Sequence, residues 1–194
     1  MKQEEAMEQI RLIREMMQKA SHRFLFSPWQ WIEWGVLIII GYLATSWLQN
    51  HGQSNHIIIL WISIFIIGAA LESYIWMAAA RRRGIEPFNA FILKLWGVAF
   101  AIMTMSIILS FIFIDLRQAL YIPGLWLMTM GVVMVTFFIL AERKDLLLFG
   151  ATQMVGGILA VSFLLEHSLL VGAVFFGIGA LIHGIYSLLK MKHL

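Results

Sequence analysis

The chain alternates between six long apolar stretches and short polar segments. Each stretch holds about twenty residues, the length that an α-helix needs to cross the hydrocarbon core of a bilayer. The stretches cover residues 29–48, 56–80, 90–114, 119–141, 146–165 and 169–189. Because 61% of the residues are hydrophobic and only 13% are charged, too little polar surface is left to cover them in water. The pattern predicts an all-α, polytopic membrane protein with six transmembrane helices.

The connections between these stretches are short. Short connections make consecutive helices antiparallel neighbours, so we expect three helical hairpins in series. One membrane domain then covers residues 28–194, after a cytoplasmic segment over residues 1–27. The dipeptide Ser27-Pro28 predicts the start of the first span, since serine is a favoured N-cap and proline fits the first helical turn. With no room for a soluble domain, any active site would lie inside the bundle.

The N-terminal segment has the pattern of an amphipathic helix. Ile10, Ile13 and Met17 fall on one stripe at helical spacing, and charged residues occupy much of the remaining surface. Together with Arg14 they form the predicted contact surface. The segment has no apolar run of the length that a secretory signal peptide requires. We expect this helix to lie on the inner surface of the membrane or to dock a protein partner.

Lysine and arginine are distributed unevenly between the two sides of the predicted membrane. Twelve of the 14 lie in the N-terminal segment, after the second span, after the fourth span and at the C-terminus, while Arg117 lies on the other side. Cytoplasmic connections carry the excess of basic residues, so both termini are expected in the cytoplasm. The net charge of +3 follows from this topology, and nucleic acid is not an expected partner.

Tryptophans gather near the ends of the predicted spans. Trp31, Trp34 and Trp96 fall toward the inner ends, and Trp61 and Trp126 toward the outer ends. Amphipathic rings of this kind anchor helices at the level of the lipid headgroups. We interpret them as an aromatic belt rather than as the wall of a cofactor site.

Four ionisable residues fall inside the spans, where an unpaired charge costs several kcal/mol. They are Glu33, Glu72, Lys94 and His183. The helical rise puts the two glutamates and the histidine roughly 7 to 14 Å from the cytoplasmic boundary, with the lysine near the start of the third span. If these side chains turn inward, they form one polar layer that binds a proton or a hard cation. The alternative is a polar network that fixes the register of the helices.

A short pattern occurs in both the second and the sixth span. Glu72 lies four residues after Gly68, and His183 lies four residues after Gly179. This spacing puts each polar residue on the same helix face as a small residue that allows close packing. It predicts that Glu72 and His183 face the bundle interior at a similar depth and interact. The similarity also indicates a threefold repeat of the hairpin.

Small residues four positions apart recur at four places in the spans. They are Gly97 with Ala101, Gly156 with Ala160, Ala173 with Gly177, and Ala180 with Gly184. Such pairs let two helices approach closely. We expect them to pack within one chain, and the alternative is a homo-oligomer.

Several classes of chemistry lack a signature in this sequence. Cysteine is absent, which excludes disulfides, thiolate nucleophiles and thiolate metal sites. No zinc-protease motif, P-loop, dinucleotide-binding glycine pattern or serine-hydrolase elbow occurs. His51, His56 and His167 fall in outer connections at a spacing that defines no metal geometry. We therefore expect no enzyme, no cofactor and no metal centre.

Short motifs are spread along the chain. They are Ile13-Arg14-Glu15-Met16-Met17, then Ser21-His22-Arg23-Phe24, then Arg81-Arg82-Arg83-Gly84, and a last span rich in glycine, histidine and tyrosine. In these motifs the chain resembles a family of small six-span membrane proteins of Bacteroidota. The resemblance covers nearly the whole chain and implies the same fold in a bacterial inner membrane. The family has more serine and glycine where this chain has Trp29, Trp31 and Glu33.

Two functions of different classes remain. In the first, the protein is a non-catalytic accessory or sensor subunit that docks a partner through its N-terminal helix. In the second, it is a small transporter or channel for a cation, a proton or a small solute, using the inner polar layer. The outer halves of the spans hold few polar residues, which favours the first, because a permeation path needs groups that replace hydration along its length.

Overall fold

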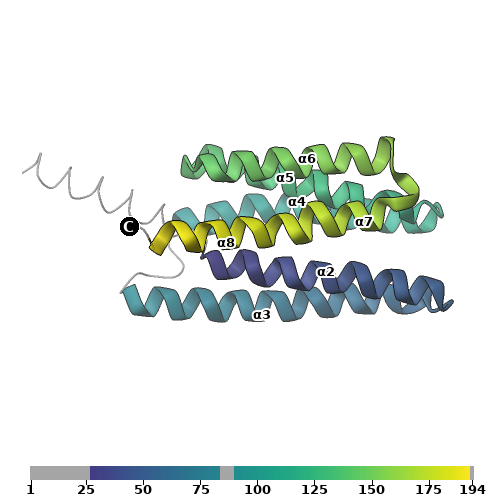
Figure 1. Cartoon of the computed structure of the whole chain (residues 1–194), viewed down its shortest axis with the longest axis horizontal. Helices are drawn as coiled ribbons and strands as arrows, with labels where there is room; N and C mark the ends of the chain where they lie inside the picture. The colour runs from purple at the N-terminus through teal and green to yellow at the C-terminus, as the bar shows by residue number, and fades with distance from the viewer. Residues whose placement is uncertain (1–26, 84–89, 193–194) are drawn as a thin grey trace, which may run out of the picture.

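The structure is a computed structural model, and it describes residues 27–83 and 90–192. The described chain is helical, with its long helices side by side and roughly parallel to one axis (Figure 1). The long helices are α2 (Pro28–Asn50), α3 (Ile57–Arg83), α4 (Ala90–Asp115), α5 (Ile122–Ala141) and α6 (Lys144–Ser162). The last span consists of α7 (Ser168–Gly172), the π-helical segment η4 (Ala173–Ile178) and α8 (Gly179–Lys192).

Six of the described helices are long and apolar enough to cross a membrane. This confirms the prediction of an all-α, multi-pass membrane protein. The predicted start of the first span is also confirmed, since Ser27 is the N-cap of α2 and Pro28 is its first residue. The second span is longer than expected, because α3 continues through the basic residues to Arg83. The predicted N-terminal helix lies outside the described residues.

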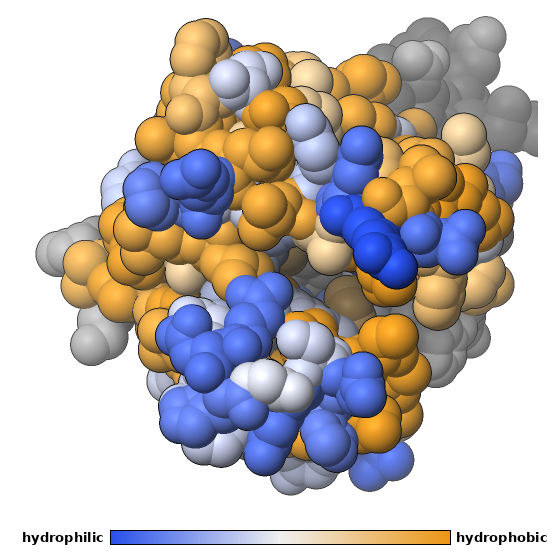
Figure 2. Space-filling model, turned by 90° about the vertical axis from the view of Figure 1, so that its right-hand side faces the viewer, coloured by the Kyte–Doolittle hydropathy of each residue, from blue (hydrophilic) through white to orange (hydrophobic). Residues whose placement is uncertain are grey.

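The connections at one end of the bundle share a common shape. A single 3-10 turn stands directly before the next span at Ser54–His56 (η1), Ala119–Tyr121 (η2) and Leu165–His167 (η3). In each case the residue after the turn already has right-handed helical backbone angles. Viewed onto this end, polar residues form separate groups surrounded by apolar ones, with a hollow between them (Figure 2).

The closest helix packing is between α5 and α6, and paired glycines make it so. A Cβ atom added at Gly131 would lie 2.9 Å from the carbonyl oxygen of Gly150, and one at Gly157 would lie 3.0 Å from that of Gly124. In lipid, close backbone approach is a main source of helix association, since the hydrophobic effect does not drive it. The four glycines therefore hold α5 and α6 together.

Only some of the small-residue pairs that the sequence predicts as helix contacts make a close contact in the structure. Gly97 has no atom within 4 Å of an added Cβ, so this part of the prediction was wrong. Gly177 and Gly184 do pack against α2, where an added Cβ would lie 2.4 Å from a side-chain carbon of Ile39 and 2.9 Å from the carbonyl oxygen of Pro28, respectively. Spacing alone cannot tell which face of a helix meets a neighbour.

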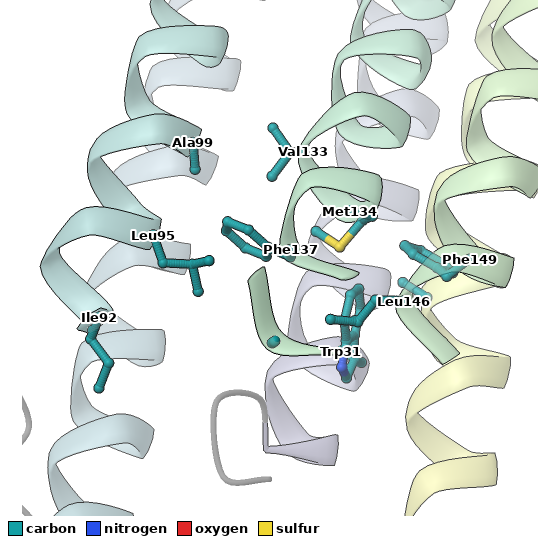
Figure 3. Packing of buried hydrophobic residues seen from close by; sticks show 11 residues of the cluster. Trp31, Ile92, Leu95, Ala99, Val133, Met134, Phe137, Leu146 and Phe149 are labelled. Atoms are coloured by element: carbon teal, nitrogen blue, oxygen red, sulfur yellow. The ribbon is translucent and has the colours of Figure 1, made fainter. Parts of the chain in front are cut away.

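Large apolar side chains fill the interior near the end of the bundle where α4 and α6 begin. Trp31 of α2, Leu95 of α4, Phe137 of α5 and Leu146 of α6 belong to one buried cluster (Figure 3). Leu95 and Leu146 are fully buried, and Phe137 is only 1% exposed. This cluster joins α2 to the consecutive helices α4, α5 and α6.

Hydrogen bonds between side chains add two matched ties between helices. Trp61 Nε1 of α3 donates to Thr45 Oγ1 of α2 at 3.0 Å, and Trp126 Nε1 of α5 donates to Ser110 Oγ of α4 at 3.1 Å. The two pairs stand at the same positions around turns η1 and η2. The indole nitrogens of Trp61 and Trp126 thus connect neighbouring helices.

The Thr45 tie gives a first prediction about stability. Replacing Thr45 with valine keeps the shape of the side chain but removes the oxygen that accepts from Trp61. We expect the free energy of unfolding to fall by about 1 kcal/mol, the usual contribution of an interhelical hydrogen bond in a membrane. Thermal unfolding in detergent measures it. Thr104→Val is the matched control, because the Thr104 hydroxyl bonds the Phe100 carbonyl of its own helix. Equal losses in both variants would contradict the prediction.

Candidate functional site

The Glu72 carboxylate of α3 points between helices and is held by two neutral donors. Its Oε1 accepts from Gln30 Nε2 at 3.3 Å, and its Oε2 accepts from Trp34 Nε1 at 3.0 Å, both from α2. A carboxylate has about four acceptor positions, so roughly two stay available. No basic side chain pairs with Glu72 within the part of the chain that the structure describes.

The start of α2 fixes the direction of the Gln30 amide. The backbone N–H of Ser27 donates to Gln30 Oε1 at 2.6 Å, as in a capping box. With its oxygen engaged there, the amide presents its NH₂ group to Glu72. The same local interaction that begins the helix therefore also orients a donor of the site.

Gly68 makes room for the second donor. A Cβ atom added at this position would lie 2.6 Å from the Trp34 ring, so only glycine lets the indole lie flat against α3. Gly68 stands one helical turn before Glu72, and the ring that covers it carries the N–H that reaches the carboxylate. Gly68 therefore makes room for the aromatic ring of Trp34, and not for the backbone of a second helix.

A cavity of about 100 Å³ adjoins this carboxylate. Since a water molecule needs roughly 10 to 15 Å³ on this measure, the cavity has room for several waters or for a small head group. Six aromatic rings and three methionines form most of its wall, together with Gln30 and Glu72. The rings are those of Trp31, Trp34, Phe65, Trp96, Phe137 and Phe176, and the methionines are Met103, Met130 and Met134.

The tryptophans of the wall bear on the interpretation of the aromatic belt: the buried Trp31 corrects it, whereas Trp96 keeps 41% of its surface exposed. Trp31, Trp34 and Trp96 line the cavity, although their positions in the sequence indicated headgroup anchors. Trp31 is only 7% exposed. Nothing in the sequence indicates this, because a ring near the end of a span has the same position in the sequence whether it faces lipid or the interior.

Glu33 is a second carboxylate in the same region. Both of its oxygens are buried, and no hydrogen-bond partner is present for them among the described residues. It lies within electrostatic range of the Glu72 carboxylate. The two acids of the predicted polar layer therefore lie in the same region of the bundle.

His183 belongs to a different group of residues. Its Nε2 lies 3.5 Å from Asp145 Oδ2, and its ring packs edge-on against Trp31 with the ring centroids 4.7 Å apart. Asp145 also accepts from Arg143, from Nε at 3.1 Å and from Nη2. The predicted contact between Glu72 and His183 is absent from the described structure, since the acid partner of His183 is Asp145.

Lys94 also departs from the predicted layer. Lys94 is exposed on α4, and it forms no ion pair in the described part of the chain. Within residues 27–83 and 90–192, no group of three or more histidine or acidic side chains is arranged to hold a metal ion. The predicted partner-contact residues Ile10, Ile13, Arg14 and Met17 lie outside the residues that the structure describes.

The arrangement can bind a group that is both cationic and apolar. A carboxylate with free acceptor positions attracts positive charge, and the faces of aromatic rings attract a cation by their quadrupoles. Sequence reasoning found Glu72 but missed Gln30 and Trp34. The capping-box position of Gln30 was the one available signal, and it gave no indication of a contact with another helix.

Fold and site define the class of the protein: a multi-pass, α-helical membrane protein whose bundle contains a cavity walled mostly by aromatic and apolar side chains, with Glu72 at its edge. Comparisons with protein-family models, with curated proteins and with solved structures find no match for the chain.

Proposed function

We propose that the protein is a small membrane transporter or carrier that binds an organic cation at Glu72. One observation carries this proposal: the Glu72 carboxylate, held among the described residues by the neutral donors Gln30 and Trp34 alone, lines a cavity walled by aromatic rings. An ionisable residue inside a span is costly and commonly marks a binding site or transport path. The same hydrogen bonds also fix the register of α2 against α3, but a role in register alone does not account for the cavity beside the carboxylate.

The chemistry of the wall favours an alkylated ammonium over a metal ion. A divalent cation prefers several oxygen ligands, and the described residues offer two carboxylates and an amide at most. An alkylammonium needs one negative charge and an apolar surface, and aromatic cages are the usual way in which proteins hold it.

Binding of radiolabelled tetramethylammonium tests this function directly. The intact protein in lipid nanodiscs should bind it saturably by equilibrium dialysis, and should carry it into proteoliposomes. Absence of saturable binding by the wild-type protein would refute the proposal.

We further propose that the six spans form three hairpins in a bacterial inner membrane, with both termini in the cytoplasm. The similar turns η1, η2 and η3 and the matched ties Trp61–Thr45 and Trp126–Ser110 support the hairpins. The excess of basic residues at one end supports the orientation. Docking of a partner by an amphipathic N-terminal helix stays a prediction, because it depends on residues that the structure does not describe.

The orientation gives a second prediction. Reporter tags that are active in only one compartment, inserted after residue 83, after residue 143 or at the C-terminus, should all report the cytoplasm, while a tag after residue 52 should report the outside. The reason is the basic excess on one side of the spans. An external signal at residue 83 would overturn this assignment.

A further inference from the structure

The seam between α3 and α4 is open, in contrast to the neighbouring seams of the bundle. α3 packs on α2, α4 packs on α5, and α5 packs closely on α6 while α2 packs on α8. Among the described residues, α3 and α4 make hardly any contact with each other. In the most apolar stretch of α3 and of α4, only 11% of the residues are buried inside the bundle. The corresponding share in the other four spans is 33% to 44%.

The cavity lies directly behind this seam. Its wall takes Phe65 and Glu72 from α3, Trp96, Ala99 and Met103 from α4, and the remaining residues from α2, α5 and η4. The outward faces of α3 and α4 carry large exposed apolar side chains, such as Ile66 and Phe100. In a membrane these faces meet acyl chains, so the seam borders lipid and not water.

We propose that this seam is a lateral portal through which a single-chain amphiphile with a small cationic head group enters the cavity from the lipid. The proposal rests on the proposed function and names its substrate class. The head group would lie against Glu72 and the aromatic rings, and its alkyl chain would extend between α3 and α4 into the acyl region. A cavity of about 100 Å³ accommodates a head group, and an open seam accommodates the chain without any further pocket.

Charge and shape together select this occupant. A neutral lipid would leave the free acceptor positions of Glu72 without a donor or charge inside the bilayer, which is costly. A fully water-soluble cation would gain nothing from a seam that borders lipid. A chain with a cationic head uses both features.

The absence of cysteine makes a clean labelling experiment available. Ala99 and Ala160 are both buried alanines, at 1% and 0% exposure, but only Ala99 lines the cavity. In nanodiscs, a pyrene maleimide dissolved in the lipid should modify the Ala99→Cys variant at least about tenfold faster than the Ala160→Cys variant, since access governs thiol labelling. Met103→Cys serves as a second cavity variant if Ala99→Cys fails to fold.

Entry from the membrane predicts a further selectivity. A bulky, membrane-impermeant maleimide, much larger than tetramethylammonium, should leave the Ala99→Cys thiol largely unmodified from the water side. Dodecyltrimethylammonium should protect the thiol from the lipid-borne reagent, whereas dodecanol should not. Protection should disappear when Glu72→Gln is added. Labelling by the water-borne reagent alone, equal rates at the two alanine positions, or equal protection by dodecanol would each overturn the portal.

The portal and the proposed function fail in distinguishable ways. If the lipid-borne reagent does not reach Ala99→Cys but tetramethylammonium still binds, the carrier function stands and the portal is refuted. If the thiol is reached from lipid but neither cation binds, the cation-binding function is refuted, and the substrate class with it.

Discussion

Replacing Glu72 with glutamine is expected to weaken tetramethylammonium binding by about 10- to 100-fold. Tetramethylammonium has no N–H to donate, so its attraction to Glu72 is that of a close charge pair, which contributes about 1.5 kcal/mol or more. A difference of about 1.4 kcal/mol corresponds to a factor of ten in affinity. Glutamine has nearly the same shape and keeps one oxygen to accept from Trp34, so the wall of the cavity stays intact. Equilibrium dialysis with radiolabelled tetramethylammonium measures the change.

The control for this variant is Glu166→Gln, the same substitution at an exposed residue of turn η3. It removes one negative charge from the protein without touching the cavity, so its affinity should stay within about twofold of the wild type, as expected for an exposed charge that salt screens. Equal weakening in both variants would mean that general electrostatics attract the probe, and would contradict a role for Glu72. Thermal unfolding of both variants checks that they are folded.

Replacing Gly131 with alanine is expected to have the largest effect on stability. The added Cβ would lie 2.3 Å from Met154 Cγ and 2.9 Å from the carbonyl oxygen of Gly150. A methionine side chain can move, but a backbone carbonyl cannot without separating α5 from α6. We expect a loss of about 1 to 3 kcal/mol, the range for overpacked interiors, measured as a lower thermal midpoint in detergent.

Gly97→Ala provides the matched control within the same chain. An added Cβ at Gly97 meets no atom within 4 Å, and alanine favours a helix over glycine by up to about 1 kcal/mol. This variant should be as stable as the wild type or slightly more so. If both alanine variants lose the same stability, then the glycine contacts between α5 and α6 are not what holds these helices together.

The two polar groups of the bundle lie on different sides of α2. Trp31 contacts His183 with one part of its ring and also lines the cavity beside Glu72. The histidine is part of a charged cluster with Asp145 and Arg143, in which the arginine neutralises the acid. Glu72 has no such partner among the described residues. This difference is why the cation site is assigned to Glu72 and the His183 cluster is left as a link between α6 and α8.

The sequence by itself determined the number, length and approximate limits of the spans. Crossing a bilayer requires about twenty apolar residues and satisfied backbone hydrogen bonds, and an α-helix meets both conditions without help from any neighbour. The start of α2 could also be predicted from the sequence, because Ser27 and Pro28 act within one helical turn. These features depend on the solvent and on nearby residues, so a single sequence is enough to predict them.

Only the tertiary structure decided which side chains meet. Glu72 and His183 share the same spacing from a glycine, but α2 packs on both α3 and α8 and so lies between the two helices that carry them. Gln153 of α6 donates to the carbonyl oxygen of Phe175 within η4 at 2.7 Å, a contact with another helix that no local pattern announces. The shared spacing from a glycine therefore predicted the wrong partner for His183, whose acid partner is Asp145. Which helix faces pack, and which seam stays open, depends on the relative rotation of helices distant in sequence, because in lipid apolar residues are equally suited to the interior and to the surface.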